Sequence, residues 1–283
     1  MTFNSLVKDY AFENDDAKCL SGWVQGINAF YKGRSSAPLP YQDFKKALLE
    51  HEILDSFIQK NSLEKLEREL LCEALTHKSL VHEMKPLANK SYERLEFLGD
   101  TVLSLIVSTT LYSDIHDFSE GELSKMRGAL VNEKTLAKIA ELMGVSEVAL
   151  VGKGEFLKRG HFNESVMADI VEALLGASYL TGGLGFAKSF FSHLCELFKS
   201  KYNMDFFSPD QLLEFDSKSK LQELTMKMFT ETPLYRVIDQ SETGFVIELV
   251  ICDKVICKAS GKSKKEAEHQ CAKKCLKEKL YNF

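Results

Sequence analysis

The chain has 283 residues, of which 45% are apolar and 27% charged, the proportions of a globular protein with a sizeable core. No uninterrupted apolar run approaches the roughly 20 residues that a membrane-spanning helix needs, and the first residues lack a basic segment followed by an apolar one. These features predict a cytoplasmic protein with no membrane partner. The net charge of −5 argues against a protein wholly devoted to nucleic acid.

Residues 1–50 form an N-terminal extension to which the sequence assigns no role. They contain Trp23, the single tryptophan, and the segment "KGRSSAPLP" at 32–40, which predicts a loop between short helices. A dimer-stabilising arm, an added RNA contact and a lineage-specific insertion all remain open for this extension.

Residues 51–205 show helical periodicity throughout and predict an all-α domain. Segments such as "LEKLERELLCEAL", "TVLSLIVSTTLY" and "SVMADIVEALLGASYL" repeat apolar residues at helix spacing. Ser119 and Glu122 have the spacing of a capping box, and the glycines of "TGGLG" at 181–185 predict the end of a helix.

Residues 206–215 are predicted as a linker, and residues 216–283 as a small α+β domain. A helix is expected to open with Ser219 and Gln222 at capping-box spacing. Three strand-like segments follow at 234–239, 245–252 and 255–260, and a last helix is expected to open with Ser263 and Glu266. From residue 258 onwards the chain carries eight lysines against three glutamates, a basic excess on an otherwise acidic protein.

The stretch "ERLEFLGD" at 93–100 carries three acids close together. On a helix, Glu93, Glu96 and Asp100 fall within an arc of about 60°. Their mutual repulsion costs a few tenths of a kcal/mol per neighbouring pair even in water, so stability alone does not explain them. Taken by itself, the stretch still favours a solvated charged face.

A second pair of acids, Asp169 and Glu172, changes this interpretation. The surrounding residues Ala168, Ala173, Gly176 and Ala177 are small, which predicts a helix that packs closely against another helix. Carboxylates on such a helix are costly to bury unless they are paired or bind a cation. Two facing acidic helices favour Mg²⁺, and a basic second domain favours a phosphodiester substrate in nucleic acid.

The seven cysteines do not have the spacing of a zinc site. Cys271 and Cys275 share one face of the predicted last helix, and Cys252 and Cys257 lie in strands. The sequence favours reduced core cysteines.

Four motifs in order resemble the ribonuclease III family: "ALTHKS" at 74–79, "ERLEFLGD" at 93–100, "SEGELSKMRGALV" at 119–131 and "ADIVEALLGA" at 168–177. The segments "KLQEL" and "GKSKKEAEHQCAKKCL" resemble a double-stranded-RNA-binding domain. The resemblance covers about residues 55–281. It implies an all-α nuclease domain with the ribonuclease III endonuclease fold, followed by an α-β-β-β-α RNA-binding domain.

The resemblance also implies an activity: a Mg²⁺-dependent endoribonuclease that cuts double-stranded RNA, leaving 5′-phosphate and 3′-hydroxyl ends with short 3′ overhangs. Its expected substrates are ribosomal RNA precursors and other structured transcripts. Mn²⁺ is an expected substitute, and no small-molecule cofactor is expected. Carried over by position, the metal ligands are Glu96, Asp100, Asp169 and Glu172, of which Asp100 and Glu172 are the strongest catalytic candidates.

Further residues receive lesser roles from the resemblance. Glu93 and Glu120 match secondary acids near the cleavage site, whereas Glu122 is interpreted as a helix cap. Family nuclease domains act as homodimers, and Phe97 and Leu98 are candidates for that interface, with core packing as the alternative. The RNA-binding candidates in the second domain are Gln222, for the minor groove, and Lys262, Lys264 and Lys265, for phosphates.

Several interpretations stay open at this stage. His77 is a conceivable general base, but its motif is structural in the family. Arg159 and His161 could contact RNA or lie in an ordinary surface loop. The short connection "DQSETG" at 239–244 replaces a longer RNA-contacting loop of the family, which leaves RNA affinity in question. A catalytically inactive RNA-binding relative is the rival function, although such a protein has no reason to keep all four acids.

Overall fold

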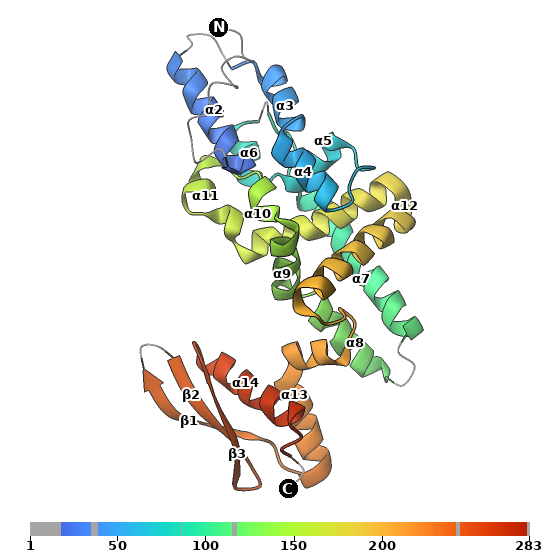
Figure 1. Ribbon diagram of the computed structural model, residues 1–283, viewed down its shortest axis with the longest axis vertical. Coiled ribbons are helices and arrows are strands. Elements are labelled where there is room, and N and C mark those ends of the chain that lie inside the picture. The colour runs from blue at the N-terminus through green and yellow to red at the C-terminus, as the bar shows by residue number, and fades with distance from the viewer. Residues whose placement is uncertain (1–17, 35–38, 86, 115–117, 242–243, 282–283) are drawn as a thin grey trace. The chain divides into compact units, whose positions relative to one another are not determined.

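The computed structural model describes residues 18–34, 39–85, 87–114, 118–241 and 244–281, without the side chains of Arg34, Asp114 and 209–216. The chain divides into two compact units, residues 1–206 and 207–283. The first unit is built from helices, and the second combines helices with an antiparallel sheet (Figure 1). The structure confirms the predicted fold class of both parts.

The described part of the large unit is helical, apart from the isolated bridge between Thr76 and Leu150. Its elements are α2 (Leu20–Arg34), α3 (Tyr41–Leu49), α4 (Glu52–Lys60), α5 (Arg68–Leu75), α6 (Lys78–Glu83), α7 (Glu93–Asp114), α8 (Glu120–Leu130), α9 (Glu133–Met143), α10 (Val145–Val148), α11 (Lys153–Leu157), the 3₁₀ helix η2 (Gly160–Phe162) and α12 (Glu164–Tyr202).

Helices α7 and α12 form the centre of this unit and cross at very short range. A Cβ atom added to Gly99 would lie 1.7 Å from the carbonyl oxygen of Glu172, and one added to Gly176 would lie 2.2 Å from that of Leu95. Only glycine permits this backbone approach, because helix separation depends on the side chains at the crossing. The predicted close packing of the second acidic helix is therefore confirmed, with Gly99 as the matching residue on α7.

Both central helices are long and apolar enough, by length and composition, to span a bilayer. Neither helix contains a long uninterrupted apolar run, because acidic residues interrupt both sequences. In this structure α7 and α12 pack against each other, and each carries acids at the crossing. A buried core helix passes the same test of length and composition.

The glycines of "TGGLG" interrupt α12, as predicted. Gly182 and Gly183 have non-helical backbone angles, and Gly183 has φ 65° and ψ −165°, a combination open to glycine alone. The ribbon of α12 changes direction within the helix (Figure 1). Its second half packs Phe191 and Phe198 edge-on against Phe206, which ends the unit.

The described part of the N-terminal extension belongs to the core of the large unit. Trp23 is 1% exposed and its ring lies 5.3 Å from that of Phe44 on α3 and 4.9 Å from that of His51. The Ser21 hydroxyl donates to Ala149 O at 2.7 Å and accepts from Val151 N at 2.8 Å. Residues 18–34 and 39–50 of the extension are thus part of the packed unit, whereas residues 1–17 and 35–38 lie outside the described part of the chain.

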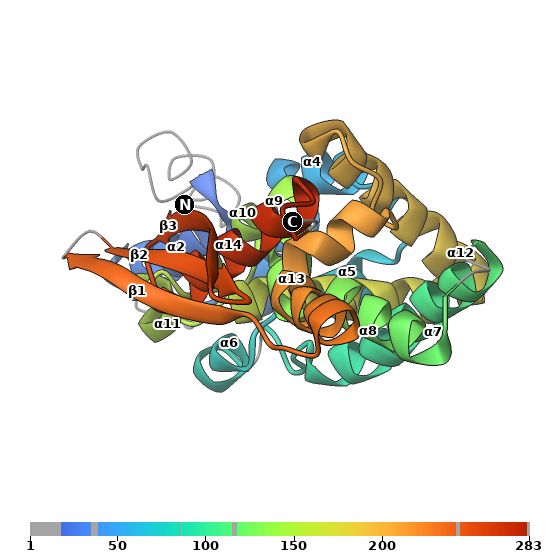
Figure 2. The ribbon, with the colours of Figure 1, turned by 90° about the horizontal axis from the view of Figure 1, so that it is seen from below.

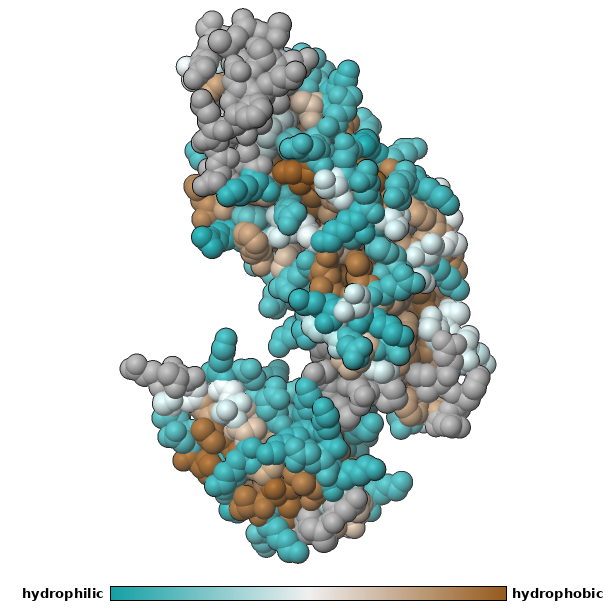
Figure 3. Space-filling model, viewed as in Figure 1, coloured by the Kyte–Doolittle hydropathy of each residue, from teal (hydrophilic) through white to brown (hydrophobic). Residues whose placement is uncertain are grey.

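The small unit consists of α13 (Pro209–Phe229), β1 (Leu234–Ser241), β2 (Gly244–Ile251), β3 (Lys254–Gly261) and α14 (Lys264–Lys277). The strands pair antiparallel in the order β1-β2-β3. The helices lie on one side of the sheet (Figures 1 and 2), where Leu221, Ile247, Leu249 and Cys271 share a core. Figure 3 shows apolar patches over the strands, and Leu234 and Val255 are among the exposed apolar residues there.

The predicted start of the first helix of this unit is wrong. Helix α13 begins at Pro209 with Ser208 as its N-cap, so most of the predicted linker 206–215 is helical and Ser219 lies inside the helix. Serine followed by proline is itself a helix-start signal, because proline fits the first helical position. The remaining caps agree better: Ser119 and Glu122 form the full capping box, and Ser263 caps α14 by accepting from Glu266 N.

The cysteines are free thiols. Cys72, Cys257, Cys271 and Cys275 are buried, which confirms their interpretation as core residues. The connection between β1 and β2 is short, since Ser241 pairs with Gly244, and the two residues between them lie outside the described part.

Candidate active site

The four predicted metal ligands lie on the two central helices, at the glycine crossing. Glu96 and Asp100 belong to α7, and Asp169 and Glu172 belong to α12. Asp100 is exposed, and the other three are partly buried. The carboxyl of Glu172 feels the charges of Asp100, Glu96 and Asp169, so the structure brings these acids from two distant segments into one cluster.

Burial and mutual repulsion disfavour the charged forms of this cluster. Burial, followed by the charges of Asp100 and the other acids, raises the pKa of Glu172 to about 8. Burial and then the charge of Asp169 raise the pKa of Glu96. Burial also raises the pKa of Asp169, although a hydrogen bond from Tyr92 opposes this shift. At neutral pH the Glu172 carboxyl therefore stays largely protonated unless a positive charge lies beside it.

Among the described residues, the charge of Lys78 lowers the pKa of Glu96 and of Asp169, but burial outweighs it for both carboxyls. The four carboxylates make no ion pair there, and one hydrogen bond reaches them from another side chain: the Tyr92 hydroxyl donates to Asp169 Oδ2 at 3.2 Å. Half-buried acids without a partner are costly, and a hard divalent cation is the ligand whose oxygen preference matches this donor set.

The side chains do not, however, show a finished metal centre. In the described residues, no three His, Cys, Asp or Glu side chains are arranged so that they could hold a metal ion. The donor types and their unmet charge fit a divalent cation, but the side-chain rotamers do not display its coordination. The ligand set Glu96, Asp100, Asp169 and Glu172 accordingly remains a prediction.

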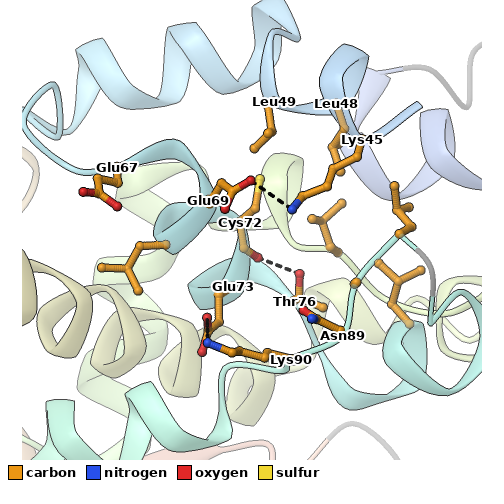
Figure 4. A pocket seen from close by; sticks show the side chains of 15 residues that line it. Lys45, Leu48, Leu49, Glu67, Glu69, Cys72, Glu73, Thr76, Asn89 and Lys90 are labelled. Carbon is orange, nitrogen blue, oxygen red and sulfur yellow. Dashed lines mark hydrogen bonds and ion pairs between the residues drawn. The ribbon is translucent and has the colours of Figure 1, made fainter. Parts of the chain in front are cut away.

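A second group of acids shows how carboxylates look when the chain neutralises them itself. A pocket between α3, α5 and residues 87–90 contains Glu69 and Glu73 (Figure 4). Lys45 Nζ lies 3.0 Å from Glu69 Oε1, and Lys90 Nζ lies 3.3 Å from Glu73 Oε2. None of the four clustered acids lines this pocket. The contrast supports the cluster at the helix crossing as the chemical site.

Of the two secondary acids, Glu93 lies near the acid cluster, because its charge contributes to the raised pKa of Glu96, whereas Glu120 lies on α8. Glu93 is exposed, and the Lys78 ammonium and the Ser91 hydroxyl donate to it, which lowers its pKa. Glu120 opens α8, is exposed and accepts from the Ser124 hydroxyl at 3.0 Å. In the described residues, no hydrogen bond or ion pair joins either acid to the four clustered acids.

His77 has a structural role, as its motif indicated. Its Nδ1 accepts from Ser79 N at 3.2 Å and so caps α6. Burial lowers the pKa of this imidazole. A side chain already engaged in capping is a poor general base, so the structure supports the structural interpretation.

The loop that contains Arg159 and His161 is not an ordinary surface loop. His161 is 5% exposed and lies between the rings of Phe156 and Phe162, with centroids 5.0 and 4.3 Å away. Its interpretation as an RNA contact or surface residue is wrong, because η2 turns the ring inward. Arg159 remains exposed, with φ 58°.

The predicted interface residues differ in exposure. Phe97 is 79% exposed, which excludes core packing within this chain, whereas Leu98 is partly buried. Leu105 and Tyr112 are also exposed on α7, at 50% and 78%. Together with Phe97 they form an apolar row along the helix, which we call the α7 row.

The predicted RNA-binding residues of the small unit are all exposed. Lys262, Lys264 and Lys265 lie at the start of α14, where the Ser263 side chain caps the helix by accepting from Glu266 N. Gln222 is exposed on α13. Among the described residues, no ion pair joins an acid to these three lysines, although the Glu266 carboxylate beside them accepts from Lys262 N at 2.8 Å. Glu248, in contrast, lies between Arg236 and Lys258 at 3.9 and 3.7 Å.

Comparisons with known proteins agree with this division. The family model "Ribonuclease-III-like" matches residues 67–197, and the model "Double-stranded RNA binding motif" matches residues 217–279. A protein named ribonuclease 3 from Syntrophobacter fumaroxidans is 40% identical over 73% of this chain and 86% of its own length. This chain belongs to the ribonuclease III family.

A second relative by sequence supports the same assignment. Ribonuclease 3 from Campylobacter fetus is 42% identical over 73% of this chain and 89% of its own length. A solved nuclease domain of ribonuclease III from Campylobacter jejuni is 36% identical, covers 53% of this chain and 99% of its own length, and has a TM-score of 0.48. As a ribonuclease III with an RNA-binding module, the protein is an endoribonuclease that cleaves double-stranded RNA.

Two residues of the ribonuclease III site were not singled out from the sequence. Gly99 sets the helix separation that gathers the acids, and Tyr92 contacts one of them. Gly99 lies within "ERLEFLGD", where a glycine inside an apolar helix was an available signal. Tyr92 precedes that motif, and no periodicity marks it.

Proposed function

We propose that this ribonuclease III uses Mg²⁺, or Mn²⁺ in its place, bound by Glu96, Asp100, Asp169 and Glu172. The observation that supports this proposal is the raised pKa of Glu172, to about 8, caused by burial and by three neighbouring acids. In the described chain no basic side chain pairs with the four acids. A divalent cation would both ionise the cluster and offset its repulsion.

The residues of the cluster then have distinct tasks. A bound Mg²⁺ supplies polarisation of the scissile phosphate, a more acidic water and stabilisation of the leaving 3′ oxygen. Asp100 on α7, whose charge acts on Glu172 on α12, would provide ligands from one helix and Glu172 from the other, while Glu96 and Asp169 would complete the oxygen set. Glu93 and Glu120 orient water or RNA. The expected products carry 5′-phosphate and 3′-hydroxyl ends with short 3′ overhangs.

The small unit supplies affinity for the duplex. The lysines at the start of α14 meet phosphates, and the adjoining N–H groups of the helix add to the attraction. Gln222 on α13 reads 2′-hydroxyls in the minor groove. With the connection between β1 and β2 as short as Ser241 and Gly244 allow, affinity depends mainly on these two helices.

We further propose that the nuclease unit forms a homodimer through the α7 row. Phe97, Leu105 and Tyr112 are large, apolar and exposed on one helix, a pattern that marks interaction surfaces when it is contiguous. Leu98, beside Phe97, lies at the margin of this surface. Phe97→Asp should convert dimers into monomers in sedimentation experiments, whereas Leu157→Asp, another exposed apolar position, should leave the dimer intact.

The proposed biological substrates are ribosomal RNA precursors and other structured transcripts, and the proposed compartment is the cytoplasm. These transcripts contain the long duplexes that an A-form-specific nuclease recognises.

The decisive experiment compares the wild type with Glu172→Gln on a long RNA duplex, with Mg²⁺ or with a chelator. The wild type should cut only with the metal, and the variant should bind the duplex but cut on the order of 10³-fold more slowly, since several kcal/mol of metal catalysis are lost. A matched DNA duplex should survive. A wild type that bound the RNA without cutting it would favour the binding-only rival.

A further inference from the structure

Asp169 is the one clustered acid that another side chain holds in place among the described residues. The Tyr92 hydroxyl donates to its Oδ2 at 3.2 Å, whereas Glu96, Asp100 and Glu172 receive no side-chain hydrogen bond there. Tyr92 is 3% exposed. A buried hydroxyl normally has a partner, and here the partner is a proposed metal ligand.

The Tyr92 backbone is fixed by the segment that precedes α7. Its N–H donates to Thr76 O at 2.9 Å, and its carbonyl accepts from Glu96 N at 2.8 Å, which starts the helix. Thr76 in turn pairs with Leu150, through Leu150 N and Leu75 O at 2.8 Å. The tyrosine is therefore anchored at both backbone groups before its side chain reaches α12.

The Tyr92 ring is supported from the side by His77. The two ring centroids are 5.8 Å apart, and the His77 imidazole is itself held by its cap on Ser79. His77 N also donates to Leu150 O at 2.8 Å. Besides capping α6, the histidine of "ALTHKS" thus supports the ring whose hydroxyl contacts Asp169.

We propose that Tyr92 is a positioning residue that orients the Asp169 carboxylate for the divalent cation. The inference rests on the proposed metal site, and it adds a residue to which the proposed function gives no role. Partners that orient a metal ligand commonly change metal affinity by about 10- to 100-fold when they are lost. Because Tyr92 immediately precedes α7 and its hydroxyl contacts Asp169 on α12, the orientation of Asp169 also depends on the helix crossing.

The test is Tyr92→Phe, which removes the hydroxyl and keeps the ring against His77. Mn²⁺ binding to the full-length, RNA-free protein is measured by calorimetry, and the Mg²⁺ concentration for half-maximal cleavage is measured in parallel. The dissociation constant of Mn²⁺ and the half-maximal Mg²⁺ concentration should each rise by about 10-fold. The affinity for RNA in chelator should stay at the wild-type value. Tyr41→Phe, at the start of α3, is the matched control and should change neither constant.

A double-mutant cycle separates positioning from a general structural role. In the Asp169→Asn background, Tyr92→Phe should cause no further loss of Mn²⁺ affinity, because its effect passes through the missing carboxylate. An equal loss in both backgrounds would overturn the proposal. Tyr92→Phe with wild-type Mn²⁺ affinity would overturn this inference alone, whereas a wild type that bound no Mn²⁺ would overturn the proposed metal site together with it.

Discussion

The two units place charge in opposite ways. In the nuclease unit, Glu96, Asp169 and Glu172 are partly buried close to one another. Burial and the repulsion of other acids raise the pKa of all three carboxyls. In the RNA-binding unit, the lysines at the start of α14 are exposed, and Glu248 lies between Arg236 and Lys258. A catalytic site uses buried groups whose pKa values are shifted until a ligand binds. Attraction of a polyanion requires only charged side chains that stay in contact with water.

The largest expected effect comes from widening the helix crossing. Gly176→Ala places a methyl group where Leu95 O lies 2.2 Å away, so α7 and α12 must separate. We expect a loss of about 3 kcal/mol or more in the free energy of unfolding, measured in urea, together with loss of cleavage. Gly128→Ala on α8 is the control, since its added Cβ meets no atom within 4 Å.

That control should change stability in the other direction. Alanine is a better helix former than glycine, and Gly128→Ala should stabilise the protein by about 0.5–1 kcal/mol. Equal effects of the two substitutions would contradict the role of the crossing.

The next effect concerns the exposed lysines. Replacing Lys262, Lys264 and Lys265 by alanine should weaken binding to any duplex RNA and reduce the slope of log affinity against log salt by about 2–3. Cleavage at saturating RNA should stay near the wild-type rate, because the acids are untouched. Lys277→Ala, in the last turn of α14, is the matched control. An unchanged salt slope in the triple variant would remove these lysines from the interface.

The acid cluster also predicts how stability depends on pH without metal. The pKa of Glu172 is about 8 in the folded chain and near 4.5 when unfolded, so only the unfolded chain releases this proton between those values. The contribution of Glu172 is therefore most favourable below pH 4.5 and is lost as pH rises towards 8. In a chelator, the melting temperature of the wild type should fall over this range more steeply than that of Glu172→Gln. Parallel curves for the two proteins would contradict this prediction.

The smallest effect separates the two kinds of acid most clearly. Glu248→Gln removes an acid flanked by two cations and should destabilise the protein by less than about 1 kcal/mol at neutral pH. Glu172→Gln should instead stabilise the metal-free protein. The change in the free energy of unfolding is measured for both variants in urea with chelator. If both changes had the same sign, repulsion within the acid cluster would not destabilise the protein.

The sequence predicted the helical nuclease unit, the sheet-containing RNA-binding unit and the residues of the acid cluster. Acids such as Asp169 and Glu172 are detectable because alanine and glycine neighbours imply close packing, and packed carboxylates imply a ligand. Burying a carboxylate without a ligand is unfavourable in free energy, and this is why these residues can be recognised from the sequence alone.

Other features could not be predicted because they depend on partners far along the chain. Trp23 is a core residue only because Phe44 and His51 surround it, and Tyr92 matters only because Asp169 lies across the helix crossing. His161 is buried by two neighbouring rings that periodicity does not reveal. The start of α13 was missed for a local reason: the helix begins directly after Ser208, at Pro209, and the Ser208 side chain makes no capping hydrogen bond, so it gave no capping-box signal.

The central claim is that the acids of α7 and α12 form one divalent-metal site. The most direct test is anomalous diffraction from crystals of the wild type soaked in Mn²⁺. The claim predicts an anomalous peak between the two helices, with oxygens of Asp100 and Glu172 at about 2.1 Å, the distance typical of Mg²⁺ sites. Saturating Mn²⁺ that bound elsewhere, or left this crossing empty, would contradict it.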